Sequence, residues 1–362
     1  MSSRPILIMA GGTGGHVYPA LAVARALQQQ SQDIVWLGTH RGIESTVVPA
    51  ANIKIEWISI QGLRGKGVLT LLLAPLRLLW ALAQSTSVMI RYRPAAVLGM
   101  GGFVSGPGGL AAWLTRRPLV IHEQNAVAGL TNRLLARLAR VVLQAFPGSF
   151  PAGIRAETLG NPVRPDIAAI DDPASRFANR SGPIRLLVLG GSQGALALNR
   201  TVPQALALLS KTARPIVRHQ AGKLTLQTAV DAYTDAGLDV NVTPFIDDMA
   251  EAYAWADIVV CRAGALTVAE IAAAGIAAVF VPFPGAVDDH QTENARSMVA
   301  AGAAVIMRET DMTPQVLAEC LGGLLASREG LKDRAIKSRA LAKPNALGRI
   351  TDVCLKAAGA LT

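Results

Sequence analysis

The chain has 362 residues, of which 51% are hydrophobic, 17% are charged and 4% are aromatic. No apolar run reaches the roughly 18 residues of a transmembrane helix, and the N-terminus enters a strand directly, so neither a membrane span nor a signal peptide is expected. Three scattered cysteines give neither a disulfide framework nor a metal-binding spacing, which fits a reducing cytoplasm. A chain of this length predicts two domains.

The net charge of +10 is confined to one half of the chain. Residues 1–162 contain 15 Lys and Arg against 5 Asp and Glu, whereas residues 163–362 contain 20 of each kind. This asymmetry predicts an anionic partner for the first half. Because no nucleic-acid-binding signature appears, we expect a membrane surface or a phosphorylated substrate, and no nucleic acid.

The chain begins with a pattern that predicts a βαβ unit. A strand at residues 5–9 leads into Gly-Gly-Thr-Gly-Gly-His at 11–16, a helix over about 18–30 and a strand at 34–37. A dinucleotide site would need a carboxylate at the end of the second strand, which has none, so NAD and FAD are excluded. The glycine loop still suits a phosphate or an acceptor hydroxyl. His16 is either a functional group of this loop or a helix cap.

Residues 64–83 form the most apolar segment, in which large side chains share one helical face. With its basic neighbours, this segment predicts a helix that lies in the lipid headgroup region and attracts anionic lipids. A core helix of an α/β domain is the alternative, and one helix can serve both purposes. The residues expected at the membrane are Leu72, Leu73, Leu76, Leu79, Trp80 and Arg77.

A second glycine loop, residues 101–109, follows a strand at 95–100. Two such loops at the carboxyl ends of parallel strands make room for a diphosphate. The next strand, at 119–122, ends in His-Glu-Gln-Asn at 122–125, where open α/β sheets hold their ligands. Glu123 is either a functional acid or a buried acid that holds a loop.

The opening pattern recurs in the second half, after a polar stretch at 166–182 that we expect to be a linker or surface loop. A strand at 184–189 leads into Gly-Gly-Ser-Gln-Gly at 190–194 and a helix to about residue 210. This internal similarity predicts an α/β protein with two Rossmann-like parallel-sheet halves facing each other across a cleft. A final helix within 343–362 could pack back on the first half.

The strand at 257–261 and the helix after it predict an anion site. The first turn of this helix contains Ala265, Leu266 and Thr267, whose backbone N–H groups lie at the positive end of the helix dipole. Glu270, one turn further, could accept hydrogen bonds from ribose hydroxyls. The alternative is an ordinary βα unit with a salt-bridged glutamate.

Six motifs occur together and in order. They are Gly-Gly-Thr-Gly-Gly-His at 11–16, Gly-Met-Gly-Gly-Phe-Val-Ser-Gly-Pro at 99–107, His-Glu-Gln-Asn at 122–125, Gly-Asn-Pro-Val-Arg at 160–164, Gly-Gly-Ser-Gln-Gly-Ala at 190–195 and Cys-Arg-Ala-Gly-Ala-Leu-Thr-Val-Ala-Glu at 261–270. Through these motifs the whole chain resembles the MurG family of bacterial peptidoglycan synthesis. The resemblance implies a GT-B glycosyltransferase with two domains around a deep cleft. It also implies inverting transfer of N-acetylglucosamine (GlcNAc) from UDP-GlcNAc to the C4 hydroxyl of the muramoyl sugar (MurNAc) of lipid I, giving lipid II.

The resemblance further assigns a part to each domain. Residues 1–162, with the final helix, would bind the acceptor and the membrane, and residues 163–342 would bind UDP-GlcNAc. The donor site would contain Thr13, Gly14, Gly15, Asn125, Arg164, Ser192, Ile246, Ala265, Leu266, Thr267, Glu270, Gln291 and Asn294. The two glycine loops would hold the acceptor diphosphate through Gly14, His16, Gly101, Gly102 and Ser105.

Inverting transfer needs a base near the acceptor hydroxyl and stabilisation of the departing diphosphate. His16 is the first candidate base because histidine titrates near neutrality, and Glu123 is the second. No Asp-X-Asp motif ends a strand, so no metal ligands and no tightly bound cofactor are expected, while stimulation by a divalent cation stays open. The acids of the 247–248 and 288–289 pairs are expected to be helix-cap or loop residues.

Two other functions are compatible with the same fold: a UDP-sugar epimerase or hydrolase, and a non-catalytic nucleotide-binding protein at the membrane. The epimerase or hydrolase would have no use for a basic, apolar membrane face. For the transferase, the expected location is the cytoplasmic face of the bacterial inner membrane, peripherally attached. Its expected partners are UDP-GlcNAc, lipid I, anionic lipids and, as a further possibility, other proteins of cell-wall synthesis and division.

Overall fold

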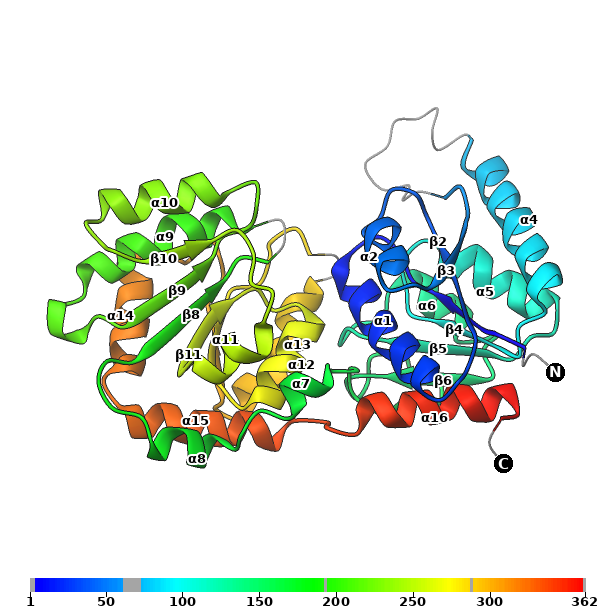
Figure 1. Cartoon of the computed structure of the whole chain (residues 1–362). Helices are drawn as coiled ribbons and strands as arrows, with labels where there is room; N and C mark the ends of the chain where they lie inside the picture. Colours follow the sequence, from blue (N-terminus) through cyan, green and yellow to red (C-terminus); the bar gives the residue numbers. More distant parts are fainter. Residues whose placement is uncertain (1–3, 61–72, 192–193, 287–288, 361–362) are drawn as a thin grey trace. The chain divides into compact units, whose positions relative to one another are not determined.

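The computed structural model describes residues 4–60, 73–191, 194–286 and 289–360 (Figure 1). The chain divides into two compact units. The first is Met1–Val163 together with Asn345–Thr362, and the second is Arg164–Pro344. Each unit is built on one parallel sheet, which confirms the predicted α/β class with two Rossmann-like domains.

The first unit contains a seven-stranded sheet in the order β3-β2-β1-β4-β5-β6-β7, with parallel pairing throughout. Strand order reverses between β1 and β4, and ligands of open α/β sheets bind at the carboxyl ends of strands beside such a point. The strands are β1 Ile6–Met9, β2 Ile34–Gly38, β3 Lys54–Trp57, β4 Ala96–Gly99, β5 Leu119–Glu123, β6 Val141–Gln144 and β7 Glu157–Thr158.

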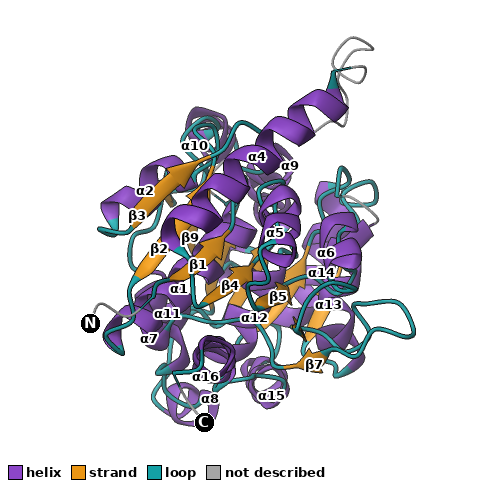
Figure 2. Ribbon diagram, turned by 90° about the vertical axis from the view of Figure 1, so that its right-hand side faces the viewer, coloured by secondary structure: helices purple, strands orange, loops and turns teal. Residues whose placement is uncertain are grey.

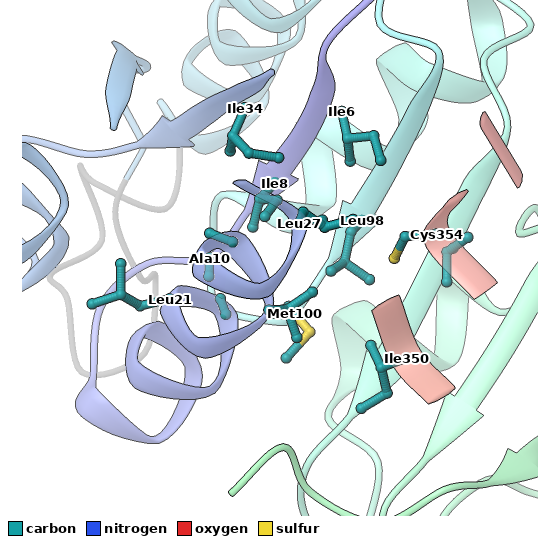
Figure 3. Close-up of a cluster of buried hydrophobic side chains, with 14 of the residues drawn as sticks. Ile6, Ile8, Ala10, Leu21, Leu27, Ile34, Leu98, Met100, Ile350 and Cys354 are labelled. Atoms are coloured by element: carbon teal, nitrogen blue, oxygen red, sulfur yellow. The ribbon is translucent and has the colours of Figure 1, made fainter. Parts of the chain in front are cut away.

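Helices cover both faces of this sheet, with α1 and α16 on one face and α4, α5 and α6 on the other (Figure 2). Alternate side chains of β1 point to opposite faces of the sheet, because successive side chains of a strand alternate in direction. Ile6 and Ile8 pack with Ile350 of α16 (Figure 3), whereas Leu7 and Met9 belong to the opposite cluster. The helices are α1 Gly14–Gln29, α2 Glu44–Ala50, α4 Ala74–Tyr92, α5 Ser105–Leu114, α6 Leu130–Leu135 and α16 Ala346–Ala358.

Helix α1 begins earlier than the sequence pattern predicts. The predicted start at about residue 18 is wrong, because the backbone N–H groups of His16 and Val17 already donate to the Thr13 carbonyl. Two glycines carry no apolar periodicity that could reveal a helix, so the pattern becomes visible only a turn later. The consequence is that His16 lies on the first turn of α1.

The second unit contains a six-stranded parallel sheet in the order β10-β9-β8-β11-β12-β13, which reverses between β8 and β11. The strands are β8 Arg185–Leu189, β9 Ile216–Gln220, β10 Asn241–Thr243, β11 Ile258–Cys261, β12 Ala277–Phe280 and β13 Ala304–Ile306. The helices are α7 Pro165–Ala168, α8 Pro173–Ala178, α9 Leu196–Leu208, η1 Lys211–Ala213 (a 3₁₀ turn), α10 Leu226–Asp235, α11 Met249–Trp255, α12 Ala265–Ala274, α13 His290–Ala300, α14 Pro314–Leu325 and α15 Arg328–Ala340.

The stretch at 166–182 is not the linker that its polar composition predicts, since it contains most of α7 and all of α8. Each of these short helices has a proline in its first turn, where the missing N–H is not needed. The Asp172 carboxylate caps α8 by accepting a hydrogen bond from the Ala174 amide at 2.8 Å. The proline at the start of each helix, and the Asp172 cap of α8, therefore favour helices in a segment whose polar composition suggested a loop.

Candidate functional site

The two glycine loops of the first unit meet at the carboxyl ends of β1 and β4. A Cβ atom on Gly102 (φ +81°) would lie 2.3 Å from the Gly11 carbonyl oxygen, and one on Gly101 (φ +95°) would lie 2.7 Å from His16 Nδ1. Only glycine permits both the backbone conformation and the close approach. The loops therefore form one continuous backbone surface beside the His16 ring, where the sequence predicted a diphosphate site.

A buried acid that the sequence analysis missed holds the first of these loops. Glu44, at the start of α2, accepts hydrogen bonds from the Gly12 amide at 2.9 Å and from the Thr39 amide and hydroxyl at 3.0 and 2.7 Å. The side chain is fully buried. Its position six residues beyond the second strand gave no signal, because the contact with Gly12 is made across the loop.

Among the residues predicted for this region, Ser105 also acts on the loop rather than facing outward. Its side chain is fully buried, its hydroxyl oxygen accepts from the Gly101 amide at 3.1 Å, and its hydroxyl lies 2.9 Å from the Gly101 carbonyl oxygen. Thr13 and Gly15, in contrast, are exposed, and Gly14 is half-buried. The exposed part of the loop surface is thus mainly backbone, with Thr13 and the half-buried His16 beside it.

Glu123 is the last residue of β5, at the same edge of the sheet as the glycine loops, and it is only 2% exposed. One carboxylate oxygen accepts from the Asn125 amide and side chain, at 2.9 and 3.2 Å, and the other accepts from the Gly129 amide and the Asn132 side chain, at 3.2 and 2.9 Å. All four donors belong to the loop and the helix after β5. This geometry favours the alternative stated for Glu123, a buried acid that holds a loop.

His16 is held by a residue that the sequence analysis did not single out. Its Nδ1 atom lies 2.8 Å from the side-chain oxygen of Gln124. Gln124 is buried, and its amide nitrogen donates to the His122 carbonyl at 3.0 Å and lies 3.1 Å from His122 Nδ1. The motif at 122–125 contained this glutamine, but only the fold shows that it points toward His16.

In the second unit, three polar side chains converge beside α12. The Tyr253 hydroxyl of α11 donates to Glu270 Oε2 at 3.1 Å, and Arg164 Nε lies 3.8 Å from Glu270 Oε1. Burial raises the pKa of Glu270 to about 7, and the Arg164 charge opposes this rise. The structure thus brings together two predicted donor-site residues, Arg164 and Glu270, and adds Tyr253, which no sequence motif indicated.

The start of α12 has the predicted form. Its N-cap Gly264 has extended backbone and no side-chain cap, and Leu266 and Thr267 of the first turn are partly exposed, while Ala265 is buried. Gln291 Oε1 accepts from the Ala263 amide at 3.2 Å, and the buried Asn294 donates to the Ala263 carbonyl at 3.1 Å. These two predicted sugar ligands therefore brace the turn that precedes α12.

One other predicted donor-site residue lies near a neighbouring strand end. Ile246 is half-buried in the loop between β10 and α11. Ser192 lies outside the described residues, but Gly191 before it is held by Gln220, whose side chain accepts from the Gly191 amide and donates to its carbonyl, both at 3.0 Å. Asp248 caps α11, as expected, by accepting from the Glu251 amide at 2.8 Å.

No group of three or more His, Cys, Asp or Glu side chains that could hold a metal ion occurs among the described residues. Asp288, of the second predicted acid pair, lies outside them.

Helix α4 buries a different face from the one that carries its largest apolar side chains. Its buried residues include Ala81, Ser85 and Met89, whereas Leu76, Leu79 and Trp80 are 62–65% exposed and Arg77 is exposed. The core-helix alternative is therefore wrong for these side chains. Leu73, just before α4, is also exposed, and Leu72 lies outside the described residues.

The two neighbouring helices also carry exposed apolar side chains. Helix α5 packs on α4 and α6 packs on α5 (Figure 2). Trp113 and Leu114 of α5 and Leu130 and Leu134 of α6 are each at least half exposed. We call these four residues and Leu76, Leu79 and Trp80 the apolar face. None of the described helices is both long and apolar enough to cross a membrane.

Comparison with known proteins supplies the remaining evidence. Residues 6–144 match the glycosyltransferase family 28 N-terminal domain, and residues 185–350 match the C-terminal domain of the same family. One relative is a UDP-N-acetylglucosamine--N-acetylmuramyl-(pentapeptide) pyrophosphoryl-undecaprenol N-acetylglucosamine transferase of Alkalilimnicola ehrlichii. The two sequences are 57% identical, and the match covers 98% of this chain and 99% of the relative. The chain is 55% identical to the protein of that name in Marinobacter nauticus, over 98% of both chains.

A solved structure is similar over the whole chain. The crystal structure of Acinetobacter baumannii MurG is 44% identical, covers 98% of this chain and 99% of its own, and superimposes with a TM-score of 0.84. The likeness therefore includes both units and all the strand ends described above.

Proposed function

We propose the function of this chain from one premise, which its relatives establish: the chain belongs to the MurG family within glycosyltransferase family 28. It is a glycosyltransferase of the GT-B fold that uses UDP-GlcNAc as donor. It transfers GlcNAc to the C4 hydroxyl of the MurNAc of lipid I and so forms lipid II. The full-length match to transferases carries this conclusion, and nothing comparable favours an epimerase, a hydrolase or a non-catalytic protein.

The geometry supports a division of labour between the units. The second unit would bind UDP-GlcNAc, with the first turn of α12 facing the diphosphate and Glu270 accepting from the ribose hydroxyls. The first unit would bind the lipid I diphosphate on the two glycine loops, where the exposed residues Thr13 and Gly15 at the start of α1 favour an anion. Each substrate thus meets a helix N-terminus at a strand-order reversal.

We assign the base to His16. The C4 hydroxyl oxygen of the acceptor attacks the anomeric carbon of GlcNAc from the face opposite the phosphate, the bond from that carbon to the phosphate oxygen breaks, and its electron pair leaves with UDP. The hydroxyl proton passes to His16. The backbone amides of α12 stabilise the charge that develops on UDP. Glu123 is not assigned this role, because both its oxygens already accept hydrogen bonds from its own loop.

The apolar face supports attachment to the membrane that contains lipid I. Exposed Trp and Leu side chains with the exposed Arg77 among them fit an interfacial binding mode, in which arginines attract anionic headgroups. We propose that this face lies on the cytoplasmic side of the inner membrane. The protein would then be a peripheral one that meets its acceptor at the surface.

The test is transfer of radiolabelled sugar from UDP-GlcNAc to a short-chain lipid I analogue. The wild-type chain should form the labelled disaccharide product and release one UDP per transfer. His16→Ala should bind UDP with unchanged affinity and lose turnover. Conversion of UDP-GlcNAc to free sugar or to another UDP sugar, with no labelled acceptor, would instead identify a hydrolase or an epimerase.

A further inference from the structure

A chain of hydrogen bonds leads from the backbone of β5 and the loop after β7 to the His16 ring. His122 Nε2 lies 2.9 Å from the Gly160 carbonyl oxygen, His122 Nδ1 lies 3.1 Å from the Gln124 amide nitrogen, and the Gln124 side-chain oxygen lies 2.8 Å from His16 Nδ1. Every member except His16 is buried. The order of these contacts allows the hydrogen positions to be deduced.

Two backbone carbonyls fix the direction of the chain, because a carbonyl oxygen can only accept. The Gly160 carbonyl requires a hydrogen on His122 Nε2, and the His122 carbonyl, 3.0 Å from the Gln124 amide nitrogen, requires that this nitrogen and not the oxygen faces His122. The Gln124 oxygen therefore faces His16. An amide oxygen cannot donate, so the hydrogen between them belongs to His16 Nδ1.

The position of the ring hydrogen of His122 agrees with this deduction. This ring is fully buried, and burial lowers its pKa to about 4, so it is neutral at physiological pH. A neutral ring with its hydrogen on Nε2 has a lone pair on Nδ1, which can accept the second Gln124 amide hydrogen. His122 thus supports the Gln124 amide in one orientation, and Asn161 holds the Gln124 backbone by donating to its carbonyl at 3.0 Å.

We infer that Gln124, oriented by His122, is a positioning residue that holds neutral His16 as the Nδ1–H tautomer and leaves the Nε2 lone pair for the acceptor hydroxyl. This inference rests on the proposed role of His16 as the base. A neutral imidazole accepts a proton only at the nitrogen that lacks one, so the wrong tautomer would present an N–H group to the acceptor. After proton transfer, the Nδ1–H group still donates to Gln124, and the imidazolium keeps its orientation.

Gly101 also restricts the orientation of the His16 ring. A Cβ atom at this position would lie 2.7 Å from His16 Nδ1 and 2.8 Å from Cε1, so the backbone packs directly against the ring edge that faces Gln124. Two neighbours, one polar and one steric, therefore define the orientation of the ring.

The tautomer can be measured directly by two-dimensional NMR of the full chain labelled with ¹⁵N-histidine, because protonated and unprotonated imidazole nitrogens resonate far apart. The chain has five histidines, and His16→Gln identifies the His16 signals. In the wild type at alkaline pH, where an imidazole ring is neutral, we expect a protonated Nδ1 and an unprotonated Nε2. The opposite pattern would overturn the inference.

Gln124→Met keeps the length of the side chain and removes its acceptor. We expect the Nδ1–H preference of His16 to be lost and kcat to fall by roughly tenfold, less than the loss of the base itself, with KM for both substrates unchanged. The matched control is Gln32→Met. Gln32 is also a buried glutamine of the first unit, and it donates to the Arg4 and Asp33 carbonyls. This control should leave both the tautomer and kcat unchanged.

The outcomes separate this inference from the function on which it rests. An unaltered His16 tautomer in folded Gln124→Met would overturn the positioning role and leave the transferase intact. Full transfer by His16→Gln would instead overturn the proposed base, and with it the catalytic meaning of the tautomer. A KM increase in Gln124→Met at unchanged kcat and tautomer would show that Gln124 only shapes the loop, against the inference.

Discussion

The backbone amide of Gly12 donates a hydrogen bond to the side-chain carboxylate of Glu44 over 2.9 Å. The first glycine loop, which has the form of a phosphate-binding loop, is therefore already bonded to an acidic side chain of the same unit. Dinucleotide-binding proteins place an acid at the end of the second strand to hold a ribose. Here the acid comes from the start of α2 and holds the loop itself. The loop is thereby shaped before any ligand binds, and the Gly12 amide is used for that purpose.

Removing this acid should destabilise the first unit. Glu44→Ala removes the acceptor of the Gly12 and Thr39 amides, and each such hydrogen bond contributes about 0.5–1.5 kcal/mol. We expect the free energy of unfolding, measured by urea denaturation, to fall by at least that amount. Glu157→Ala removes a half-exposed acid paired with Arg349 and should change stability by less than about 1 kcal/mol. Equal effects of the two substitutions would contradict the bracing role.

His16 and Glu123 should differ in what their replacement affects. In Glu123→Gln, an NH₂ group replaces one accepting oxygen, so two loop hydrogen bonds are lost and stability should fall by about 1–3 kcal/mol. His16→Gln should change stability by only about 1 kcal/mol and lower kcat by roughly 10²–10⁴, the usual contribution of a general base. Thermal unfolding and steady-state kinetics on both variants test this. A stable, inactive Glu123→Gln would return Glu123 to the list of candidate bases.

The raised pKa of Glu270 predicts how stability depends on pH. The carboxyl has a pKa of about 7 in the folded chain, against an ordinary value of 4.5, because burial disfavours its charge. The folded state therefore keeps a proton that the unfolded state releases. The resulting stabilisation is complete below about pH 4.5 and is lost as pH rises through about 7, at about 1.4 kcal/mol for each pKa unit.

Calorimetry of the wild type and Glu270→Gln from about pH 5 to 9 should reveal this loss, because glutamine does not titrate. The wild type should lose stability relative to the variant as pH increases. Parallel curves over the whole range would show that Glu270 has an ordinary pKa. Glu251→Gln is the matched control, since Glu251 lies in the same unit with a half-exposed side chain paired with Arg218.

Substitution of the apolar face should weaken membrane binding without affecting the chemistry. Leu79→Gln and Trp80→Gln each remove an exposed apolar side chain, and burial of such a group contributes about 1.5–3 kcal/mol, or roughly tenfold in affinity or more. Co-sedimentation with vesicles that contain anionic lipids measures the loss, and transfer to a water-soluble acceptor analogue should stay unchanged.

Leu208→Gln is the control for this experiment, because Leu208 is a similarly exposed leucine on α9 of the second unit. It should bind vesicles as the wild type does. If the two α4 variants also bound normally, the apolar face would not be the membrane-binding surface.

The sequence by itself determined the parts of this protein that depend on local pattern. The glycine loops at 11–16 and 101–109, the start of α12 at Ala265 and the final helix Ala346–Ala358 all follow from residue periodicity and from glycine at strand ends. Two repeats of strand, glycine loop and helix also determined the two parallel sheets. These features are set by neighbours in the chain, so they can be recognised without knowledge of the packing.

Only the tertiary structure decided which side chain each functional residue meets. Gln124 reaches His16 from 108 residues away, Glu44 reaches Gly12 from 32, and Tyr253 donates to Glu270 from a different helix. The role of Glu123 and the exposed face of α4 were likewise ambiguous until the partners were known. Such contacts depend on how helices pack across a sheet and bring distant loops to one edge, and no local sequence pattern encodes that arrangement.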